Sequence, residues 1–159
     1  MLLRPYTPDD WHRLCEIHDR ARIGELRAAG LEAAYLTLEQ TAENEGLFDG
    51  AVTVAVLDGE VQGFAAVRDG ELTWLYVIPH MQGRGIGRAL LRHAIDACDG
   101  DIAAEVLLGN DAALQLYRSE GFAIERKVDG RLAGNERFAA SGHYLRRGAS
   151  GVARPPSDG

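Results

Sequence analysis

The sequence has little of what marks secreted, membrane-spanning or nucleic-acid-binding proteins. It contains two cysteines in 159 residues, and basic residues number 17 against 24 acidic ones, for a net charge of −7. No apolar stretch approaches the ~20 residues of a membrane span, and Arg4 and Pro5 interrupt the apolar start that a leader peptide would need. Affinity for nucleic acid depends on clustered cations. We therefore expect a cytoplasmic protein with free thiols at Cys15 and Cys98 and no nucleic-acid or membrane partner.

What remains is the composition of an ordinary globular domain, 46% hydrophobic and 26% charged. The chain is long enough to bury a sizeable core. After Tyr144 it becomes rich in glycine, serine and proline, and such a segment buries too little apolar surface to offset its loss of conformational entropy. We predict one domain over residues 1–147 and a flexible tail over residues 148–159.

Hydrophobic periodicity predicts an α+β domain with a mainly antiparallel sheet. Asp58-Gly59 and Asp69-Gly70 each separate two strand-like runs, and this dipeptide is the strongest short signal for a hairpin. The predicted helices begin at Thr7, span residues 31–45 and 84–98, and lie between Asn110 and Gly121. The predicted strands span residues 1–4, 51–57, 61–68, 71–78, 102–108, 122–128 and 138–146, with a turn-rich segment at 129–135.

A glycine-rich turn joins the predicted strand 71–78 to the helix that follows it. Glycines 83, 85 and 87 alternate with Arg84, Ile86 and Arg88, so the backbone is open to close approach. The first N–H groups of a helix have no internal partner and lie at the positive end of its dipole. This pattern predicts a phosphate or pyrophosphate cradle. It differs from a dinucleotide fingerprint and from a P-loop, because position 88 is not glycine and no Gly-Lys-Ser/Thr follows.

Two segments resemble signatures of the GNAT superfamily of acetyl-CoA-dependent N-acetyltransferases. The first is Gln82-Gly83-Arg84-Gly85-Ile86-Gly87 with its lead-in Leu75-Tyr76-Val77-Ile78-Pro79. The second is Asn110-x-x-Ala113-x-x-Leu116-Tyr117-x-x-x-Gly121-Phe122. The order of predicted elements also resembles that family over residues 2–146.

This resemblance implies a central sheet of about seven strands flanked by about four helices, splayed between the fourth and fifth strands, with acetyl-CoA as cosubstrate in the opening. It implies that the pantetheine arm pairs with the backbone of Leu75, Tyr76 and Val77, and that a backbone N–H there holds the oxyanion. It implies that the diphosphate lies on the amides of residues 83–88 and that Asn110 contacts the arm from the other wall. The further implied cofactor-binding residues are Gln82, Gly83, Arg84, Gly85, Ile86, Gly87, Arg88, Asn110, Ala113 and Tyr117.

Two residues are candidates for moving protons. Tyr117 follows Asn110 by seven residues, so both face the same way on a helix, and a phenol of ordinary pKa near ~10 can protonate a departing thiolate. Glu71 is the candidate base: it precedes Gln82 by the separation that histone-acetylating members of the superfamily use. Strand alternation would place Glu71 on one face with Thr73, Leu75 and Val77. Other candidates for the base are His80, His143, Tyr144 or a water chain.

The function that these features imply is acetyl transfer from acetyl-CoA to a primary amine by direct attack in a ternary complex. The acceptor is expected to be a small molecule, bound by residues 20–45 and 129–135. Two alternatives stay open: a protein N-terminal or lysine acetyltransferase, and a non-catalytic domain that binds acyl-CoA. No metal is implied, because the histidines and cysteines lack ligand spacing. A homodimer is possible in this family.

Overall fold

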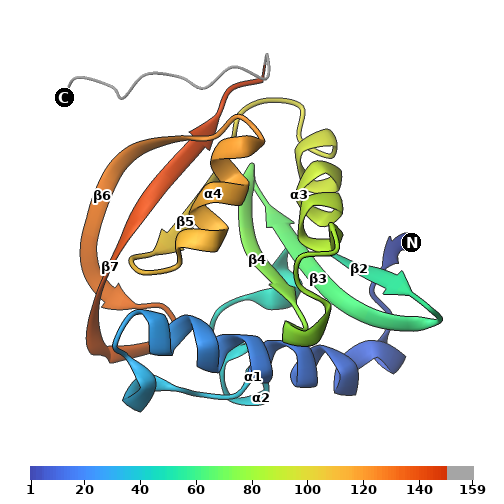
Figure 1. The fold of residues 1–159 in the computed structure, drawn as a ribbon, viewed down its shortest axis with the longest axis horizontal. Helices are drawn as coiled ribbons and strands as arrows, with labels where there is room; N and C mark the ends of the chain where they lie inside the picture. The colour runs from blue at the N-terminus through green and yellow to red at the C-terminus, as the bar shows by residue number, and fades with distance from the viewer. Residues whose placement is uncertain (150–159) are drawn as a thin grey trace.

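The computed structural model describes residues 1–149, which form seven strands in one sheet of order β1-β2-β3-β4-β5-β7-β6 (Figure 1). All neighbouring strands are antiparallel except β4 and β5. This architecture confirms the predicted α+β class with a mixed, mainly antiparallel sheet. The strands are β1 Leu2–Pro5, β2 Ala51–Leu57, β3 Glu60–Arg68, β4 Glu71–Val77, β5 Ile102–Leu107, β6 Ala123–Leu132 and β7 Asn135–Arg147.

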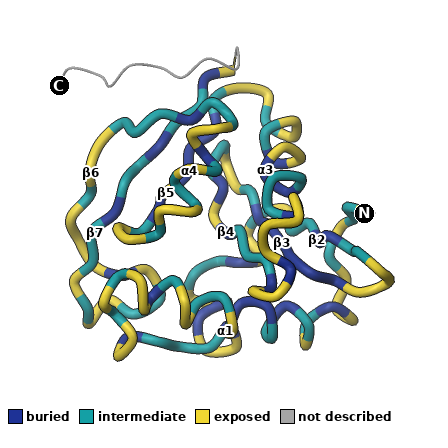
Figure 2. The backbone as a smooth tube through the Cα atoms, viewed as in Figure 1, coloured by how far each residue is buried: buried dark blue, intermediate teal, exposed yellow. Residues whose placement is uncertain are grey.

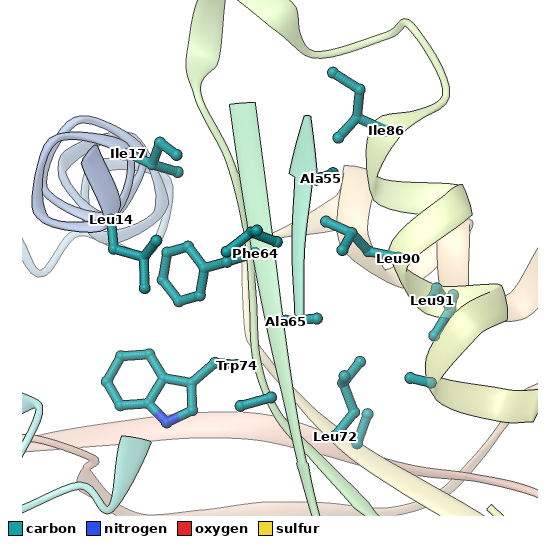
Figure 3. Packing of buried hydrophobic residues seen from close by; sticks show 14 of the residues in the cluster. Leu14, Ile17, Ala55, Phe64, Ala65, Leu72, Trp74, Ile86, Leu90 and Leu91 are labelled. Carbon is teal, nitrogen blue, oxygen red and sulfur yellow. The ribbon is translucent and has the colours of Figure 1, made fainter. Parts of the chain in front are cut away.

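Four α-helices cover the sheet: α1 Trp11–Ala28, α2 Leu38–Thr41, α3 Ile86–Asp96 and α4 Asp111–Ser119. Helices α1 and α3 lie on opposite faces, and both pack on the middle of the sheet (Figure 3). Leu14 and Ile17 of α1 lie on the side to which Phe64 points, and Leu90 and Leu91 of α3 lie on the other side. All five side chains are fully buried. Figure 2 shows this burial running through the central strands, while the turns stay exposed.

The two predicted hairpins are confirmed, and their turns explain the Asp-Gly pairs. Asp58 and Gly59 have φ of 55° and 76°, and Asp69 and Gly70 have φ of 50° and 76°. Positive φ at both central positions matches the twist of the strands that the turn joins, and glycine and aspartate tolerate it best. The β2–β3–β4 meander therefore forms from local signals.

Strands β4 and β5 pair over only two positions, Glu71 with Ala103 and Leu72 with Ala104. Beyond that point they diverge (Figure 1), so the edge of β4 from Thr73 onward has no strand beside it. The implied splay between the fourth and fifth strands is confirmed. Helices α3 and α4, each of which directly follows one of these strands in the chain, lie beside the opening.

Two local predictions are wrong. The helix expected over residues 31–45 is broken into a 3₁₀ turn at Glu32–Ala34 and the short α2, because Thr37 is extended and its side chain caps the Gln40 amide. The turn-rich segment 129–135 is mostly strand: β6 and β7 continue through it, and only Ala133 and Gly134 form the turn. Pairing between two long strands here outweighs the local turn tendency of the sequence.

Helix α3 starts two residues later than predicted, since Gly85 takes a left-handed conformation and is its N-cap. No helix within residues 1–149 is long and apolar enough to cross a membrane. The tail predicted for 148–159 falls almost wholly outside the described residues, and the domain boundary stays a prediction.

Candidate active site

The turn between β4 and α3 presents six consecutive backbone amides with no acceptor. Within the described residues, none of the N–H groups of residues 83–88 donates a hydrogen bond, whereas the next one, that of Ala89, donates to the Gly85 carbonyl at 3.0 Å. Gly83 and Gly85 have φ of 79° and 84°, and no atom lies within 4 Å of where a Cβ would be on either residue. Amides of this kind at a helix start bind anions, because they combine free donors with the positive end of the helix dipole.

The two arginines of this turn differ in their freedom. Arg84 is exposed and makes no ion pair or hydrogen bond within the described part of the chain. Arg88 instead pairs with Glu120 and donates to the Ser119 hydroxyl at 2.9 Å. Arg88 therefore joins α3 to the end of α4, and Arg84 is the cation free to meet a phosphate.

Helix α4 forms the opposite wall of the opening. Its N-cap is Asn110, whose Oδ1 accepts from the Ala113 amide at 3.4 Å. Tyr117 lies in the helix at 6% exposure with its ring against Phe122, and its hydroxyl makes no hydrogen bond within the described residues. Burial, with a smaller contribution from Glu25, raises the pKa of Tyr117 far above its ordinary value. The phenol thus keeps its proton at neutral pH and can donate it.

A β-bulge changes the face to which Glu71 points. Ala66 pairs with Trp74 but Val67 pairs with Leu72, so Thr73 is an extra residue in β4 and alternation is interrupted. Figure 3 accordingly shows Leu72 toward α3 and Trp74 toward α1. The expectation that Glu71 shares a face with Leu75 and Val77 is wrong: Glu71 lines a cavity on the α1 side together with Trp74.

This cavity, of about 410 Å³, lies at the end of the opening between β4 and β5. Strand β4 contributes Glu71, Thr73, Trp74 and Tyr76 to its wall, and β5 contributes Glu105. The segments expected to bind the acceptor also line it, through residues of the range 22–45 and of 130–135. Of the other candidates for the base, none lines the cavity: His80 is exposed beyond the end of β4, and His143 and Tyr144 lie on β7.

Comparison with known proteins shows which proteins the chain resembles. A sequence model described as an acetyltransferase (GNAT) domain matches residues 48–124. The chain is 53% identical over 53 residues to the N-alpha-acetyltransferase RimI of Mycobacterium tuberculosis, covering 33% of this chain and 34% of the relative. It is 41% identical over 97 residues to a streptothricin acetyltransferase of Streptomyces lavendulae, covering 54% and 51%. The matches thus span only about a third and about half of these curated relatives.

Solved structures give the same result for the fold. A ribosomal-protein-alanine N-acetyltransferase from Brucella melitensis superposes with a TM-score of 0.66 at 26% identity, covering 93% of this chain and 99% of the other. A phosphinothricin acetyltransferase from Sinorhizobium meliloti, in complex with acetyl-CoA, superposes with a TM-score of 0.69 at 20% identity, covering 99% and 94%. The chain therefore contains a region similar to the GNAT acetyltransferase domain, over residues 48–124, and it shares the fold of these acetyltransferases.

The region that matches the GNAT domain contains the elements that carry the predicted site. Residues 48–124 include β4, the turn, α3 and α4, and therefore every residue predicted to bind the cofactor. Helix α1 lies outside the match. It nevertheless supplies part of the cavity wall, so the cavity depends on residues that neither signature contains.

Glu25 of α1 is a site residue that sequence analysis missed. Its carboxylate accepts from the Tyr76 hydroxyl at 3.2 Å and from Asn110 Nδ2 at 3.3 Å, and it pairs with Arg22 one helical turn earlier. Glu25 therefore connects α1 to both sides of the opening, β4 and the cap of α4. Burial, with the charge of Glu25 as a second cause, raises the pKa of Tyr76. No local pattern marks this role, because its partners lie 51 and 85 residues away.

His18, also in α1, was expected to be an ordinary helix residue, but it lines the cavity at 3% exposure. Its Nδ1 is 2.9 Å from the Asp19 carboxylate, which also accepts from the Leu38 amide at 2.8 Å. Burial lowers the pKa of His18, so the neutral ring is favoured. Because the carboxylate can only accept, the hydrogen belongs on Nδ1, and Nε2 has a free lone pair.

Proposed function

We propose that this protein transfers an acetyl group from acetyl-CoA to a primary amine by direct attack in a ternary complex. One observation carries the proposal: the six free amides of residues 83–88 follow the part of β4 that has left β5, and the cavity is lined by β4 from Glu71 to Tyr76. A diphosphate fits the first feature and an amine the second, and a thioester in the opening would lie between them.

The cofactor residues of the proposal are those of the two signatures. The amides of residues 83–88 and the Arg84 guanidinium would hold the diphosphate, because free donors and one unpaired cation are present there. The unpaired edge of β4, from Thr73 to Val77, would receive the pantetheine arm as an added strand. A backbone N–H of that edge would stabilise the oxyanion.

Two side chains would move protons. Glu71, which lines the cavity and makes no ion pair within residues 1–149, would take the proton from the attacking ammonium directly or through water. Tyr117 would protonate the thiolate of coenzyme A as it leaves. Its burial and raised pKa support that role, because they keep the phenol protonated.

The size of the cavity supports a small-molecule acceptor. A volume of about 410 Å³, walled by α1, β4, β5 and the β6–β7 turn, suits a compact molecule. The alternative, acetylation of a protein N-terminus or lysine, is favoured by the similarity to RimI. The second alternative, a domain that binds acyl-CoA without turnover, would not need a protonated phenol beside the opening.

The experiment that tests the proposal is release of free thiol from acetyl-CoA by the purified chain. A panel of small primary amines and of peptides with a free N-terminus serves as acceptors, and calorimetry with coenzyme A measures binding separately. Thiol release that depends on an amine supports transfer, and the better acceptor class decides between metabolite and protein. Tight binding of coenzyme A with no turnover on any acceptor would favour the binding domain. Failure to bind coenzyme A at millimolar concentration would overturn the whole assignment.

A further inference from the structure

The cavity holds more negative charge than the protein itself neutralises. Four carboxylates line it, from Glu25, Glu45, Glu71 and Glu105, and of these only Glu25 makes an ion pair within the described residues. The other three come from different parts of the fold: the segment after α2, then β4, then β5. These four carboxylates outnumber the two arginines that line the same cavity, Arg22 and Arg131, so the site keeps an excess of negative charge that a bound cation would offset.

Glu45 is one of the three lining carboxylates without an ion pair in the described residues. It is partly buried beside the β6–β7 turn, where the Gly134 amide donates to it, and burial raises the pKa of its carboxyl group. The two arginines that line the cavity offset only part of the charge of its four carboxylates. Arg22 is engaged with Glu25, and Arg131 makes no ion pair within residues 1–149.

His18 is a second and independent sign of what binds. It lines the cavity at 3% exposure, and its Nε2 has no hydrogen-bond partner within the described residues, although Nδ1 is held by Asp19. The charged and titratable groups facing the ring are Asp19, Arg22 and Glu25 of α1, with Tyr76 of β4. Among the described residues the only buried side-chain polar atom without a partner is His143 Nδ1, so Nε2 of His18 is accessible from the cavity, where an N–H group of a ligand or a water molecule can donate to it.

We infer that the acceptor is a compact primary amine that carries at least one further positive charge, as in diamines and polyamines. One amine is the nucleophile, at the β4 side of the cavity, after its ammonium form has lost a proton to Glu71. The second ammonium group keeps its charge and is held by Glu45 and Glu105, the carboxylates outside the proposed proton transfer. The volume of about 410 Å³ limits the acceptor to a compact molecule. This inference rests on the proposed function, which it makes more specific.

The test compares 1,4-diaminobutane with 1-aminobutane, which differ by one ammonium group at equal chain length. After correction for the two equivalent amines, we expect kcat/KM to be at least about tenfold higher for the diamine. We expect the preference to shrink as salt rises from about 0.05 to about 0.5 M, because the second contact is partly solvent-exposed. Glu45→Gln and Glu105→Gln should each reduce the diamine-to-monoamine ratio severalfold.

The matched control is Glu43→Gln, two residues from Glu45 but exposed and outside the cavity wall, which should leave the ratio unchanged. A ratio near one, or a ratio that neither cavity substitution alters, overturns the inference, as does acetylation of N-terminal peptides but of neither amine. Calorimetry of both amines in the presence of coenzyme A measures whether the second ammonium group contributes to binding, and it does not require turnover. If nothing is acetylated, the proposed function fails, while tighter binding of the diamine still supports a dication site and equal binding overturns it.

Discussion

The hydroxyl group of Tyr76 on β4 donates a hydrogen bond to Oε1 of Glu25 on α1, at 3.2 Å. Oε2 of the same carboxylate accepts from Asn110 Nδ2, at the start of α4. One side chain thereby joins both sides of the opening between β4 and β5, where the sheet itself supplies no backbone hydrogen bonds. The width of the opening is thus set by a helix outside the two family signatures.

Replacing this carboxylate should destabilise the fold. For Glu25→Ala we expect the free energy of unfolding to fall by about 2 kcal/mol, because Tyr76, Asn110 and Arg22 all lose an acceptor in a largely buried place. Urea unfolding measures the change. The control is Glu16→Ala, which removes partly exposed ion pairs with Arg13 and Arg20 and should cost less, about 0.5 to 1 kcal/mol. Equal costs for the two variants would contradict the bridging role.

Removing the phenol of Tyr117 should separate binding from turnover. Tyr117→Phe keeps the ring against Phe122 but removes the proton donor, so we expect turnover to fall by about 10²-fold with unchanged affinity for coenzyme A. Steady-state kinetics and calorimetry provide the two readouts. Tyr6→Phe, at a tyrosine that packs on Phe48 away from the cavity, is the matched control. Turnover of Tyr117→Phe equal to that of the unaltered protein would exclude the general acid.

The base can be examined in the same way. For Glu71→Gln we expect turnover to fall by about 10²-fold with little change in the affinity for coenzyme A, because the carboxylate lines the acceptor cavity and not the amide turn. Single-turnover kinetics with an amine acceptor measures the step. His80→Gln, at an exposed residue outside the cavity, should have no effect. A water chain or another residue is the base if Glu71→Gln retains full activity.

The left-handed conformation of Gly85 before α3 should matter for the affinity for coenzyme A. Gly85→Ala forces a side chain into φ of 84°, which should cost about 1 kcal/mol of stability and weaken binding of coenzyme A by about tenfold, since it distorts the amides. Gly59→Ala, at φ of 76° in the β2–β3 turn and with equally open surroundings, should have the same stability cost and unaltered binding. Calorimetry and thermal unfolding of both variants provide the comparison, and equal affinities would argue against the cradle.

The start of α1 predicts a dependence of stability on pH. Asp10 accepts from the Arg4 guanidinium at 2.8 and 2.9 Å and from the Thr7 amide at 2.9 Å. The hydrogen bonds from Arg4, and then from Thr7, hold the pKa of Asp10 below its ordinary value despite burial. A carboxyl group whose pKa is lower in the folded than in the unfolded chain stabilises the folded state at pH values above its unfolded-state pKa. This contribution is lost as the pH falls through the lower, folded-state pKa.

We therefore expect Asp10→Asn to be less stable than the unaltered protein at pH 7 and to lose less stability between pH 7 and pH 3. Midpoints of urea unfolding at the two pH values measure both differences. Asp9→Asn, at an exposed neighbour, should behave like the unaltered protein. If the unaltered protein and Asp10→Asn lost the same stability between pH 7 and pH 3, Arg4 would not lower the pKa of the Asp10 carboxyl group.

Local sequence determined the parts of this protein that depend on neighbouring residues. The Asp-Gly pairs specify their hairpins, and the glycines before α3 specify a left-handed turn with free amides, because the backbone conformation of each is decided within a few residues. Asn110 likewise caps α4 as its position predicts. From these elements, the α+β class and the cofactor side of the site could be predicted.

Only the tertiary structure decided the acceptor side. The bulge at Thr73 turns Glu71 toward α1, and strand pairing carries β6 and β7 through residues expected to be a loop. Glu25 and His18 enter the site because α1 crosses the end of the β4–β5 opening and meets residues far along the chain. Contacts between distant segments are set by packing and register, which no local pattern encodes, and they gather the cavity's carboxylates around one volume.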